Sequence, residues 1–358
     1  MAVLDHRSLN RATPHRQLLL RSSDMSAVEV IEHLVGLQAQ DPVPPEVGLW
    51  SRMRNFGIDD LEKSLHERAV VRSTLFRGTQ HLVSAEDYLW LRPLLQPMSD
   101  RWQKGGFGRF TRGIDLVALA GRARVVIGTG VVARPDLGRA LAGQGRGRAR
   151  PFGTGSASGG PSATERPSGA ARDHSVHVGR AMARAAVVRG ALPQDLVLRY
   201  LASFGPATVK DIQTWSDMTR LREVVGRLRH RLLVLGGEEG ADLFDLPDAP
   251  RPDPDTSAPV RFLAALDNVV LGHADRSRIM RQEQRKHVIV HAALFVDGFV
   301  HGLWKIDRTK GSVVLSVRLF ESLPSTEKEN VLREGGRLLR FAAGGADDHD
   351  IRFTMVQD

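Results

Sequence analysis

Cysteine is absent from the sequence and aromatic residues are scarce. Of the 358 residues none is Cys, two are Tyr, and 6% are aromatic. Without Cys the chain cannot form disulfides, iron–sulfur clusters, a thiol nucleophile or a zinc site with Cys ligands, and it fits a reducing compartment. Hydrophobic residues make up 42% of the chain, so sizeable cores can form, and these will be mostly aliphatic.

Long apolar segments are absent as well. The start of the chain, from Met1 to Arg7, contains no apolar run like that of a signal peptide. No run approaches the about 20 residues of a membrane-spanning helix. The length favours two or three domains. We therefore expect a cytoplasmic protein with no membrane partner.

Acidic residues do not balance the basic ones. Lys and Arg together number 50 against 41 Asp and Glu, which gives a net charge of +9, and Arg greatly outnumbers Lys. Clustered Arg favours a polyanionic partner because contacts with phosphate release counterions. The abundance of Arg, Ala and Gly is equally typical of a GC-rich bacterial genome. We expect a bacterial protein that associates with the nucleoid.

The first part of the chain has the pattern of helices followed by a β-hairpin. Helices are predicted at about 8–20, from Ser26, from Pro44, and at 58–66. Capping pairs are formed by Ser26 with Glu29 and by Ser84 with Asp87. Strand-like runs lie at 70–75 and 80–83, separated by Arg77-Gly78-Thr79. This order is typical of a winged helix.

The clearest DNA-binding pattern lies at 194–235. A first helix ends near Phe204, Thr208 caps a short second helix, and Thr219 caps a third helix after a tight turn. A strand at 232–235 follows, so the segment is predicted to be a helix-turn-helix with a wing. Several arginines decorate the third helix and its exit: Arg220, Arg222, Arg227, Arg229 and Arg231.

The fold class is predicted as α+β, with tandem winged-helix (helix-turn-helix) units and a C-terminal β-rich domain. The last domain is predicted to contain a hairpin with an Asp297-Gly298 turn, whose first strand begins at 288. A helix capped by Thr326 and Glu329 and a strand at 351–356 complete it. The predicted domains are an N-terminal winged helix at 1–110, a low-complexity segment at 144–191, a winged helix at 192–244, a Pro/Asp-rich connector at 245–262, and the β-rich domain at 263–358. For 111–143 a partial second winged helix is implied only by the family resemblance given below.

The segment at 144–191 differs from the rest of the chain in composition. It contains no Leu, Ile, Trp or Tyr, and Gly, Arg, Ala, Ser and Pro dominate. Such a stretch cannot bury enough apolar area to offset its ordering entropy, so it is predicted to be disordered. It could be a basic tail that clasps DNA, or a frameshifted patch that leaves the protein inactive, and we favour the second interpretation.

Two amides, at Gln38 and Gln40, are the most informative feature of the sequence. An apolar stripe at helical spacing precedes them, and Gln38 takes the next place in that stripe. A buried amide without a partner costs about 1–3 kcal/mol. Pro42 favours a helix end near Asp41, past which both amides can turn toward one site. From spacing alone we favour the alternative, in which Gln38 only holds a neighbouring backbone.

Several short motifs occur in an order and spacing that together resemble a known family, the AlkZ/YcaQ-like winged-helix DNA glycosylases of the azinomycin-resistance and crosslink-unhooking type. The motifs are Gly36-Leu37-Gln38-Ala39-Gln40-Asp41-Pro42, Arg77-Gly78-Thr79-Gln80-His81-Leu82-Val83, Leu201-Ala202-Ser203-Phe204-Gly205-Pro206-Ala207-Thr208, Leu266-Asp267-Asn268 with Gly272-His273-Ala274-Asp275-Arg276, and Val296-Asp297-Gly298. The resemblance covers most of the chain except about 144–191, where the family completes its second winged helix. It implies several winged-helix units around a DNA channel and a C-terminal β domain.

The resemblance implies that Gln38 and Gln40 are the catalytic residues of a monofunctional DNA glycosylase. Its substrates would be N-alkylated purines, including bulky adducts and interstrand crosslinks, and its product an abasic site. An N7- or N3-alkylated purine is already cationic and needs no general acid, while an amide can hold the attacking water and favour nearby positive charge. Asp41 could stabilise the sugar cation electrostatically or deprotonate the water. We favour the alternative, in which Asp41 is only a turn residue before Pro42. No cofactor is expected, and no lysine is placed for lyase chemistry.

Basic residues from several segments are the predicted DNA contacts. The loop residues among them can contact phosphates or the minor groove, or else form a structural network in which Asp275 pairs with Arg276 or caps a helix. The predicted contacts are Arg77, Arg220, Arg222, His273, Arg276 and Arg278. The expected partner is double-stranded, preferably alkylated, DNA, bound by a monomer with no obligate protein partner.

Two further hypotheses concern metal binding and the absence of catalysis. His287, His291 and His301 are predicted on alternating strand positions, where ordinary surface histidines are commoner than metal ligands, so no metal site is expected. The rival to catalysis is a noncatalytic winged-helix DNA-binding protein, such as a transcription regulator. It rests on the arginine-rich helix at 219–231 alone.

Overall fold

The computed structural model describes residues 3–41, 43–128, 130–142, 175–177, 192–238, 240–309, 312–343 and 348–357. The chain divides into two compact units: the first combines Met1–Met98 with Gly190–Asp358, and the second is Ser99–Arg189. The disorder predicted for 144–191 falls on residues that, apart from 175–177, lie outside the described part. The finer domain boundaries stay a prediction. None of the described helices is long and apolar enough to cross a membrane.

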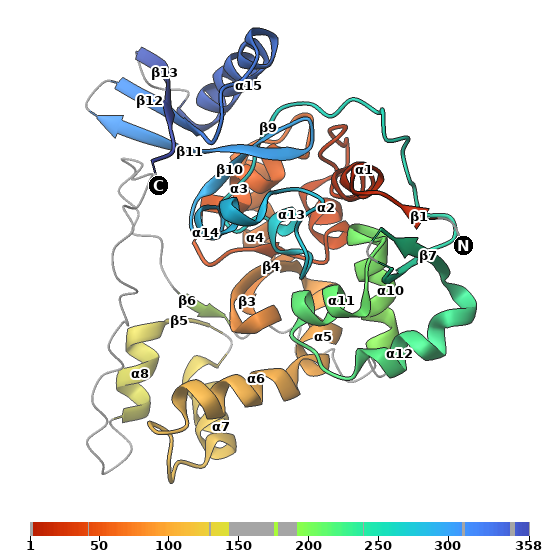
Figure 1. Ribbon diagram of the computed structural model, residues 1–358. Coiled ribbons are helices and arrows are strands. Elements are labelled where there is room, and N and C mark those ends of the chain that lie inside the picture. The colour runs from red at the N-terminus through yellow and green to blue at the C-terminus, as the bar shows by residue number, and fades with distance from the viewer. Residues whose placement is uncertain are drawn as a thin grey trace. The chain divides into compact units, whose positions relative to one another are not determined.

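The N-terminal part of the first unit combines helices with a three-stranded sheet of order β2-β4-β3. Strands β3 and β4 of this sheet, with α5 after them, are labelled in Figure 1. The caps predicted at Ser26 and Ser84 are confirmed, since each hydroxyl accepts from the backbone N–H three residues later. The elements are β1 (Val3–Leu4), α1 (His6–Arg16), α2 (Ala27–His33), β2 (Leu37–Gln38), α3 (Val43–Trp50), α4 (Ile58–His66), β3 (Val70–Thr74), η1 (Phe76–Gly78), β4 (Gln80–Ser84) and α5 (Ala85–Leu94).

The predicted continuation of the second helix through Gln38 is wrong. Helix α2 ends at His33, and the chain reverses at Val35 and Gly36, whose φ angles are 56° and 101°. The N–H of Gly36 bonds to the carbonyl of Ile31 at 2.8 Å, which is the long hydrogen bond of a Schellman motif. The chain therefore leaves the helix before the amides and enters β2 as an extended strand.

Three helices and a hairpin follow in the predicted order after residue 192. They are α10 (Pro193–Phe204), α11 (Val209–Ser216), α12 (Leu221–Leu228), the short η4 (Arg229–Arg231), β7 (Leu233–Gly237) and β8 (Asp242–Asp245), and β1 pairs in parallel with β7. Thr208 caps α11 as predicted. The cap predicted at Thr219 is wrong: Arg220, in the left-handed conformation, precedes α12, and the Leu221 N–H donates to Gln213 Oε1 at 3.0 Å.

The C-terminal part forms a five-stranded sheet of order β13-β12-β11-β10-β9, on which α15 packs. All neighbouring strands are antiparallel except β12 and β13. The predicted Asp297-Gly298 turn joins β10 to β11. The elements are β9 (Arg261–Phe262), α13 (Asn268–Leu271), η5 (Gln282–Gln284), α14 (Arg285–Val288), β10 (Ala292–Val296), β11 (Phe299–Thr309), β12 (Ser312–Leu319), α15 (Ser325–Ala343) and β13 (Asp348–Met355).

Two local predictions in this part are wrong. Val288 ends helix α14, and the strand begins only at Ala292, so His287 lies on a helix. A short apolar run does not distinguish a strand from a buried helix, which explains the error. Helix α15 begins before Thr326, because the carbonyl of Pro324 already accepts from the Lys328 N–H at 2.9 Å.

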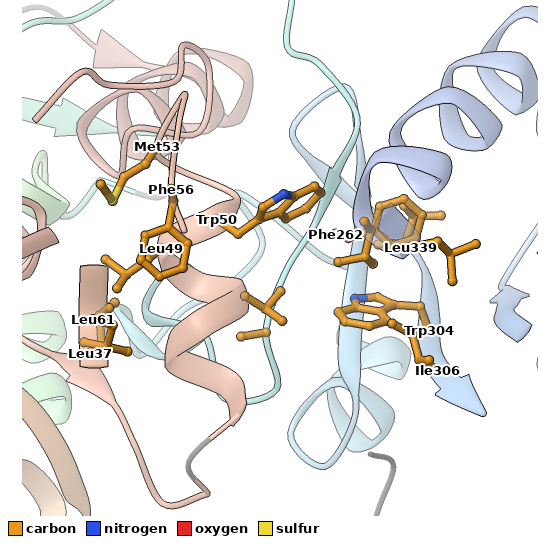
Figure 2. Close-up of a cluster of buried hydrophobic side chains, with 14 of the residues drawn as sticks. Leu37, Leu49, Trp50, Met53, Phe56, Leu61, Phe262, Trp304, Ile306 and Leu339 are labelled. Atoms are coloured by element: carbon orange, nitrogen blue, oxygen red, sulfur yellow. The ribbon is translucent and has the colours of Figure 1, made fainter. Parts of the chain in front are cut away.

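One large apolar cluster joins the N-terminal helices to the C-terminal sheet. In Figure 2, Trp50 lies between side chains of the N-terminal helices and those of the sheet. Its ring stacks on Phe341 of α15 with 5.8 Å between centroids, and Phe262 packs edge-on against Trp304 at 5.7 Å. Each large side chain buried in this way contributes roughly 1.5–3 kcal/mol. The two ends of the chain therefore share one core.

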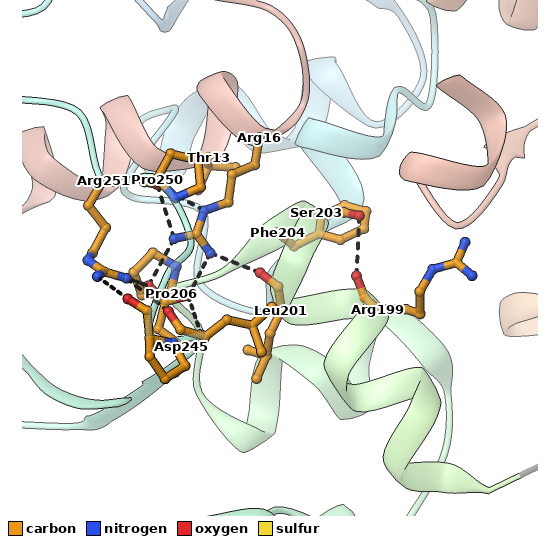
Figure 3. Close-up of polar contacts among 12 residues, drawn as sticks. Thr13, Arg16, Arg199, Leu201, Ser203, Phe204, Pro206, Asp245, Pro250 and Arg251 are labelled. Carbon is orange, nitrogen blue, oxygen red and sulfur yellow. Dashed lines mark hydrogen bonds and ion pairs between the residues drawn. The ribbon is translucent and has the colours of Figure 1, made fainter. Parts of the chain in front are cut away.

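A buried ion pair ties α1 to the three helices after residue 192. Arg16 donates to both carboxylate oxygens of Asp245, at 2.6 and 2.9 Å, and to the carbonyl of Leu201 at 2.9 Å (Figure 3). Arg251 reaches the same carboxylate at 2.7 Å. Because the carboxylate and Arg16 are both buried, these hydrogen bonds compensate for their lost hydration.

The second unit is built of helices and a short strand pair. Asp115 caps α7 by accepting from the N–H groups of Val117 and Ala118 at 2.9 and 3.0 Å. The partial winged helix predicted at 111–143 stays a prediction. The elements are the end of α6 (Gln96–Trp102), η2 (Gln103–Phe107), α7 (Leu116–Ile127), β5 (Val131–Ala133), α8 (Arg134–Ala142) and β6 (Ser175–His177), with β5 antiparallel to β6.

Candidate functional site

Gln38 and Gln40 lie along an extended segment that pairs with the start of β4. Gln38 is paired with His81, and the N–H of Ala39 bonds to the carbonyl of Gln80 at 2.8 Å. Side chains two residues apart in an extended segment point to the same side. The strand therefore brings the two amides to one face, which a continuing helix would not do.

Each amide oxygen is held by the turn between β3 and β4. Gln38 Oε1 accepts from Thr79 Oγ1 at 3.2 Å and from Arg77 Nη2 at 3.5 Å. Gln40 Oε1 accepts from the backbone N–H of Gln80 at 3.2 Å. Neither amide nitrogen donates to a residue within the described ranges. Both amides are thus fixed in orientation, and their NH₂ groups are left for water or a ligand.

The backbone around the amides is also held. Arg72 of β3 donates to the carbonyls of Ala39 and Gln40 at 2.8 and 3.0 Å. Asp41 Oδ1 accepts from the N–H of Val43 at 3.1 Å, which is the turn role that the sequence favoured. Gln38 is buried, with 7% of its surface exposed, whereas Gln40 is exposed. The pair therefore spans the boundary between protein and solvent.

His81 is a neutral imidazole beside Gln38. Its Nδ1 lies 3.0 Å from the carbonyl of Thr79, so Nδ1 carries the proton and donates it. Burial, and then the positive charge of Arg77, lower the pKa of His81 to about 3. Its ring packs edge-on against Phe76 at 5.4 Å. Near neutral pH no positive charge therefore comes from this position.

We expect mild acidification to destabilise the protein through His81. Its pKa of about 3 when folded lies below the ordinary 6.5, so the unfolded chain binds more protons between these values. From this residue the free energy of unfolding falls by about 1.4 kcal/mol per pH unit below 6.5, down to about pH 3. Urea unfolding at pH 7 and at pH 5 measures the loss, which His81→Phe should reduce by about 2 kcal/mol. An identical loss in the variant would contradict the assignment.

Arg77 connects the hairpin turn to α11 instead of projecting into solvent. Its Nη1 donates to the carbonyl of Trp215, and its Nη2 to Gln38 Oε1. Burial, and then the positive charge of Arg276, lower the pKa of Arg77 to about 10. In this structure the guanidinium holds the Gln38 amide, and a contact with DNA would be an additional role.

In the loop at 272–278, two side chains bond to backbone carbonyls and one arginine has no hydrogen-bond partner among the described residues. His273 and Arg278 are buried, and each bonds to a backbone carbonyl: His273 Nε2 lies 3.0 Å from that of Phe204, and Arg278 Nη1 donates to that of Pro206 at 2.9 Å. The structure therefore uses these two side chains in the packing of the loop. The predicted pairing of Asp275 with Arg276 is not formed, since Asp275 accepts from the N–H and hydroxyl of Ser277. Arg276 is half-buried, and it is the arginine of this loop whose guanidinium has no hydrogen-bond partner among the described residues.

Arg220 and Arg222 lie at the start of α12 and are exposed. The apolar side chains of this helix, among them Leu221 and Val224, are buried. Contact between α11 and η1 places this group of helices against the turn that holds the amides. Arg77 thus connects Gln38 to α11 through its hydrogen bonds. Arg220 and Arg222 do not take part in this connection and are exposed to solvent.

The Asp267-Asn268 motif supports β2. Asn268 Nδ2 donates to the carbonyl of Gly36, just before β2, at 2.6 Å. Asp267 accepts from the two terminal guanidinium nitrogens of Arg52 at 2.7 and 2.9 Å, and it caps α13. These contacts link the strand that carries Gln38 to the end of α3 and to the C-terminal part.

The residues opposite the amides, Thr79, Gln80 and His81, were not assigned a role from the sequence, and neither was Arg72, which holds the backbone of Ala39 and Gln40. Gln38 and Gln40 are two residues apart, which is the period of a strand. This spacing was a signal that could have predicted a strand at the two amides, paired with the run at 80–83. Over the described parts of the chain, no three His, Asp or Glu side chains gather as metal ligands.

Comparisons with known proteins agree with this architecture. A family model described as DNA glycosylase AlkZ-like matches residues 31–341. Among solved structures, the Streptomyces sahachiroi DNA glycosylase AlkZ is similar, with a TM-score of 0.74 and 18% sequence identity over 98% of this chain and 100% of that chain. A comparison with curated proteins finds no match. At this identity the structural likeness establishes a shared fold, while the family model spans most of the chain.

Proposed function

This chain belongs to the AlkZ-like DNA glycosylase family, and from that premise we propose that it excises N-alkylated purines through Gln38 and Gln40. The observation that supports the proposal is the pair of amides on one extended segment, with Gln38 Oε1 held by Thr79 of the β3–β4 turn and Gln40 Oε1 by the N–H of Gln80 at the start of β4. A purine alkylated at N7 or N3 carries a positive charge, so it leaves without a general acid. The remaining task is to direct a water to C1′ of an oxocarbenium-like sugar, which leaves an abasic site.

The hydrogen bonds of the two amides support different roles for them. Gln38 Oε1 already accepts two hydrogen bonds, so its open groups are the Nε2 donors. Gln40 Oε1 accepts one and keeps a lone pair. A water that accepts from Gln38 Nε2 and donates to Gln40 Oε1 retains a lone pair for C1′. When its oxygen bonds to C1′ of the sugar cation, the excess proton passes to solvent water, because neither amide is basic enough to take it. Because both amides are neutral, neither repels the sugar cation, and their fixed dipoles can favour it.

The three helices after residue 192 support a second part of the proposal, which concerns DNA. We assign α10, α11, α12 and the β7–β8 hairpin as a winged helix that contacts duplex phosphates through Arg220 and Arg222. Both side chains are exposed, Arg220 just before α12 and Arg222 in its first turn, while the apolar side chains of the helix are buried. Each phosphate neutralised by an arginine releases counterions, so binding should weaken with salt. The preferred partner is alkylated double-stranded DNA, bound by a monomer.

Release of a base from a duplex carrying one N7-methylguanine tests the proposed activity. Alkali cleaves the strand at the abasic site, and we expect cleaved product only after treatment with the protein. The matched duplex with ordinary guanine should yield no product, because its neutral base is a poor leaving group. The absence of product despite intact binding would favour a noncatalytic DNA-binding protein. Product from both duplexes would contradict the requirement for a cationic base.

A further inference from the structure

A cavity of about 470 Å³ opens beside the loop that carries Arg276. Its walls come from the segment 275–285, which includes η5 and the start of α14, and from the start of β11. Phe299 and Met280 contribute apolar surface, and the charged residues of the lining are Asp275, Arg276, Arg281, Arg285 and Glu321. The volume lies in the range of sites for small ligands, and it can hold a phosphate group with part of a sugar.

Arg276 has an unusual state within this cavity. Its Nε and Nη1 atoms are buried without a hydrogen-bond partner, and the guanidinium forms no ion pair with any residue that the structure describes. A buried polar donor without a partner costs about 1–3 kcal/mol, and a charged one costs more. By contrast, the neighbouring Arg281 forms two hydrogen bonds with the carboxylate of Glu321, both at 2.8 Å. Arg276 is thus arranged to be satisfied by a ligand.

The charges around Arg276 define the chemistry of that ligand. Burial, and then the positive charge of Arg285, lower the pKa of Arg276 to about 10. The carboxylates of the cavity are occupied: Glu321 by Arg281, and Asp275 by Ser277, whose N–H and hydroxyl donate to it at 3.0 and 2.6 Å. An anion would relieve the repulsion between the arginines, whereas a cationic alkylated base would add to it. The cavity therefore fits a phosphate and not the extruded base.

We propose that Arg276 binds a backbone phosphate of the DNA, next to the nucleotide whose sugar lies at Gln38 and Gln40. The loop of Arg276 and the amide site meet on α11: the Ala274 N–H donates to Asp211 Oδ1 at 2.8 Å, and Arg77, which donates to Gln38 Oε1, also donates to the carbonyl of Trp215. This assignment rests on the proposed function, because it takes the position of the sugar from it. Neutralising one phosphate there would anchor the strand while the amides act on the adjacent sugar.

Binding to an uncleavable duplex tests the contact separately from catalysis. The duplex carries a tetrahydrofuran abasic-site analogue, and fluorescence anisotropy gives the affinity of the full chain. We expect Arg276→Met to weaken binding about tenfold and to lower the slope of log affinity against log salt by about 0.9, the contribution of one phosphate. The double variant Arg281→Met, Glu321→Gln, which removes a cation and its paired carboxylate together, should bind within about twofold of the wild type. The thermal unfolding midpoint of Arg276→Met should not fall, because an unsatisfied buried charge is removed.

Replacing one phosphate at a time with an uncharged methylphosphonate identifies which phosphate of the DNA Arg276 contacts. Methylphosphonates are placed one at a time around the abasic analogue. One position should weaken wild-type binding as much as Arg276→Met does and should not weaken the variant further. If every position affected both proteins equally, the proposal would be overturned. It would also be overturned if inorganic phosphate alone stabilised the wild type and no methylphosphonate position mattered. A failure to release N7-methylguanine, with these binding results intact, would remove the proposed activity and leave the phosphate contact.

Discussion

The rate of N7-methylguanine release is expected to fall by at least about 100-fold in a Gln38→Ala, Gln40→Ala double variant. A loss of about this size is typical when one preorganised hydrogen-bonding group is removed from an active site. The double variant loses both the Nε2 donor and the amide oxygen with the open lone pair, so nothing holds the attacking water. Single-turnover rates with excess protein measure the chemical step. Affinity for the abasic-analogue duplex should stay nearly unchanged, because neither amide is charged.

Gln80→Ala is the matched control for the loss of the amides. Its side chain bonds to Thr74 Oγ1, while its backbone N–H, which every residue except proline retains, is the group that holds Gln40. We expect its rate to stay within about twofold of the wild type, as for a surface substitution away from special features. A double variant as fast as this control would refute the assignment of Gln38 and Gln40.

Two charged variants separate the roles of the amides. Gln40→Glu keeps an acceptor where we place the hydrogen bond from water, so it should retain more activity than Gln38→Glu. Gln38→Glu replaces the open Nε2 donor with a second acceptor, which cannot donate to the water. The opposite order of rates would contradict the division of roles while leaving the site itself in place.

Arg52→Met is expected to lower the free energy of unfolding by about 3–5 kcal/mol, the usual cost of removing one partner from a buried ion pair. The side chains of Arg52 and Asp267 are 0% and 1% exposed, and two hydrogen bonds of 2.7 and 2.9 Å join them. Removing the arginine leaves a buried carboxylate without its charge partner. Urea unfolding at pH 7 measures the change, and the midpoint of thermal unfolding should fall by about 10 °C.

An exposed pair provides the control for this prediction. Arg54 lies 3.2 Å from Asp24, with side chains 63% and 71% exposed. Arg54→Met should change stability by less than about 1 kcal/mol, because water already screens the pair. Adding Asp267→Asn to Arg52→Met should recover part of the loss, since it removes the unpaired charge and keeps an oxygen to cap α13. Equal losses in Arg52→Met and Arg54→Met would contradict the prediction.

The sequence by itself determined the elements whose signals are local. The cap at Ser26, the short helix that begins after Thr208, and the turn at Asp297-Gly298 all depend on residues within one turn of chain, and all are confirmed. The order of helices and strands follows from such signals. The family was also evident, because its motifs keep their order along the chain.

Only the tertiary structure decided how the amides are presented. Val35 adopts a left-handed conformation that is unfavourable for a β-branched residue, so helical periodicity predicted that the helix would continue. The strand at Gln38 forms because β4, far along the chain, supplies its hydrogen bonds, and no local pattern reports such pairing.

The tertiary structure also decided which basic residues have no hydrogen-bond partner within the described protein and can therefore bind a ligand. His273, Arg276 and Arg278 carry equivalent signals in the sequence, yet backbone carbonyls of distant segments occupy His273 and Arg278. Arg276 stays without a partner among the described residues because the nearby carboxylates are already paired. Charge is a property of the sequence, whereas the competition for hydrogen-bond partners depends on which segments meet in the fold.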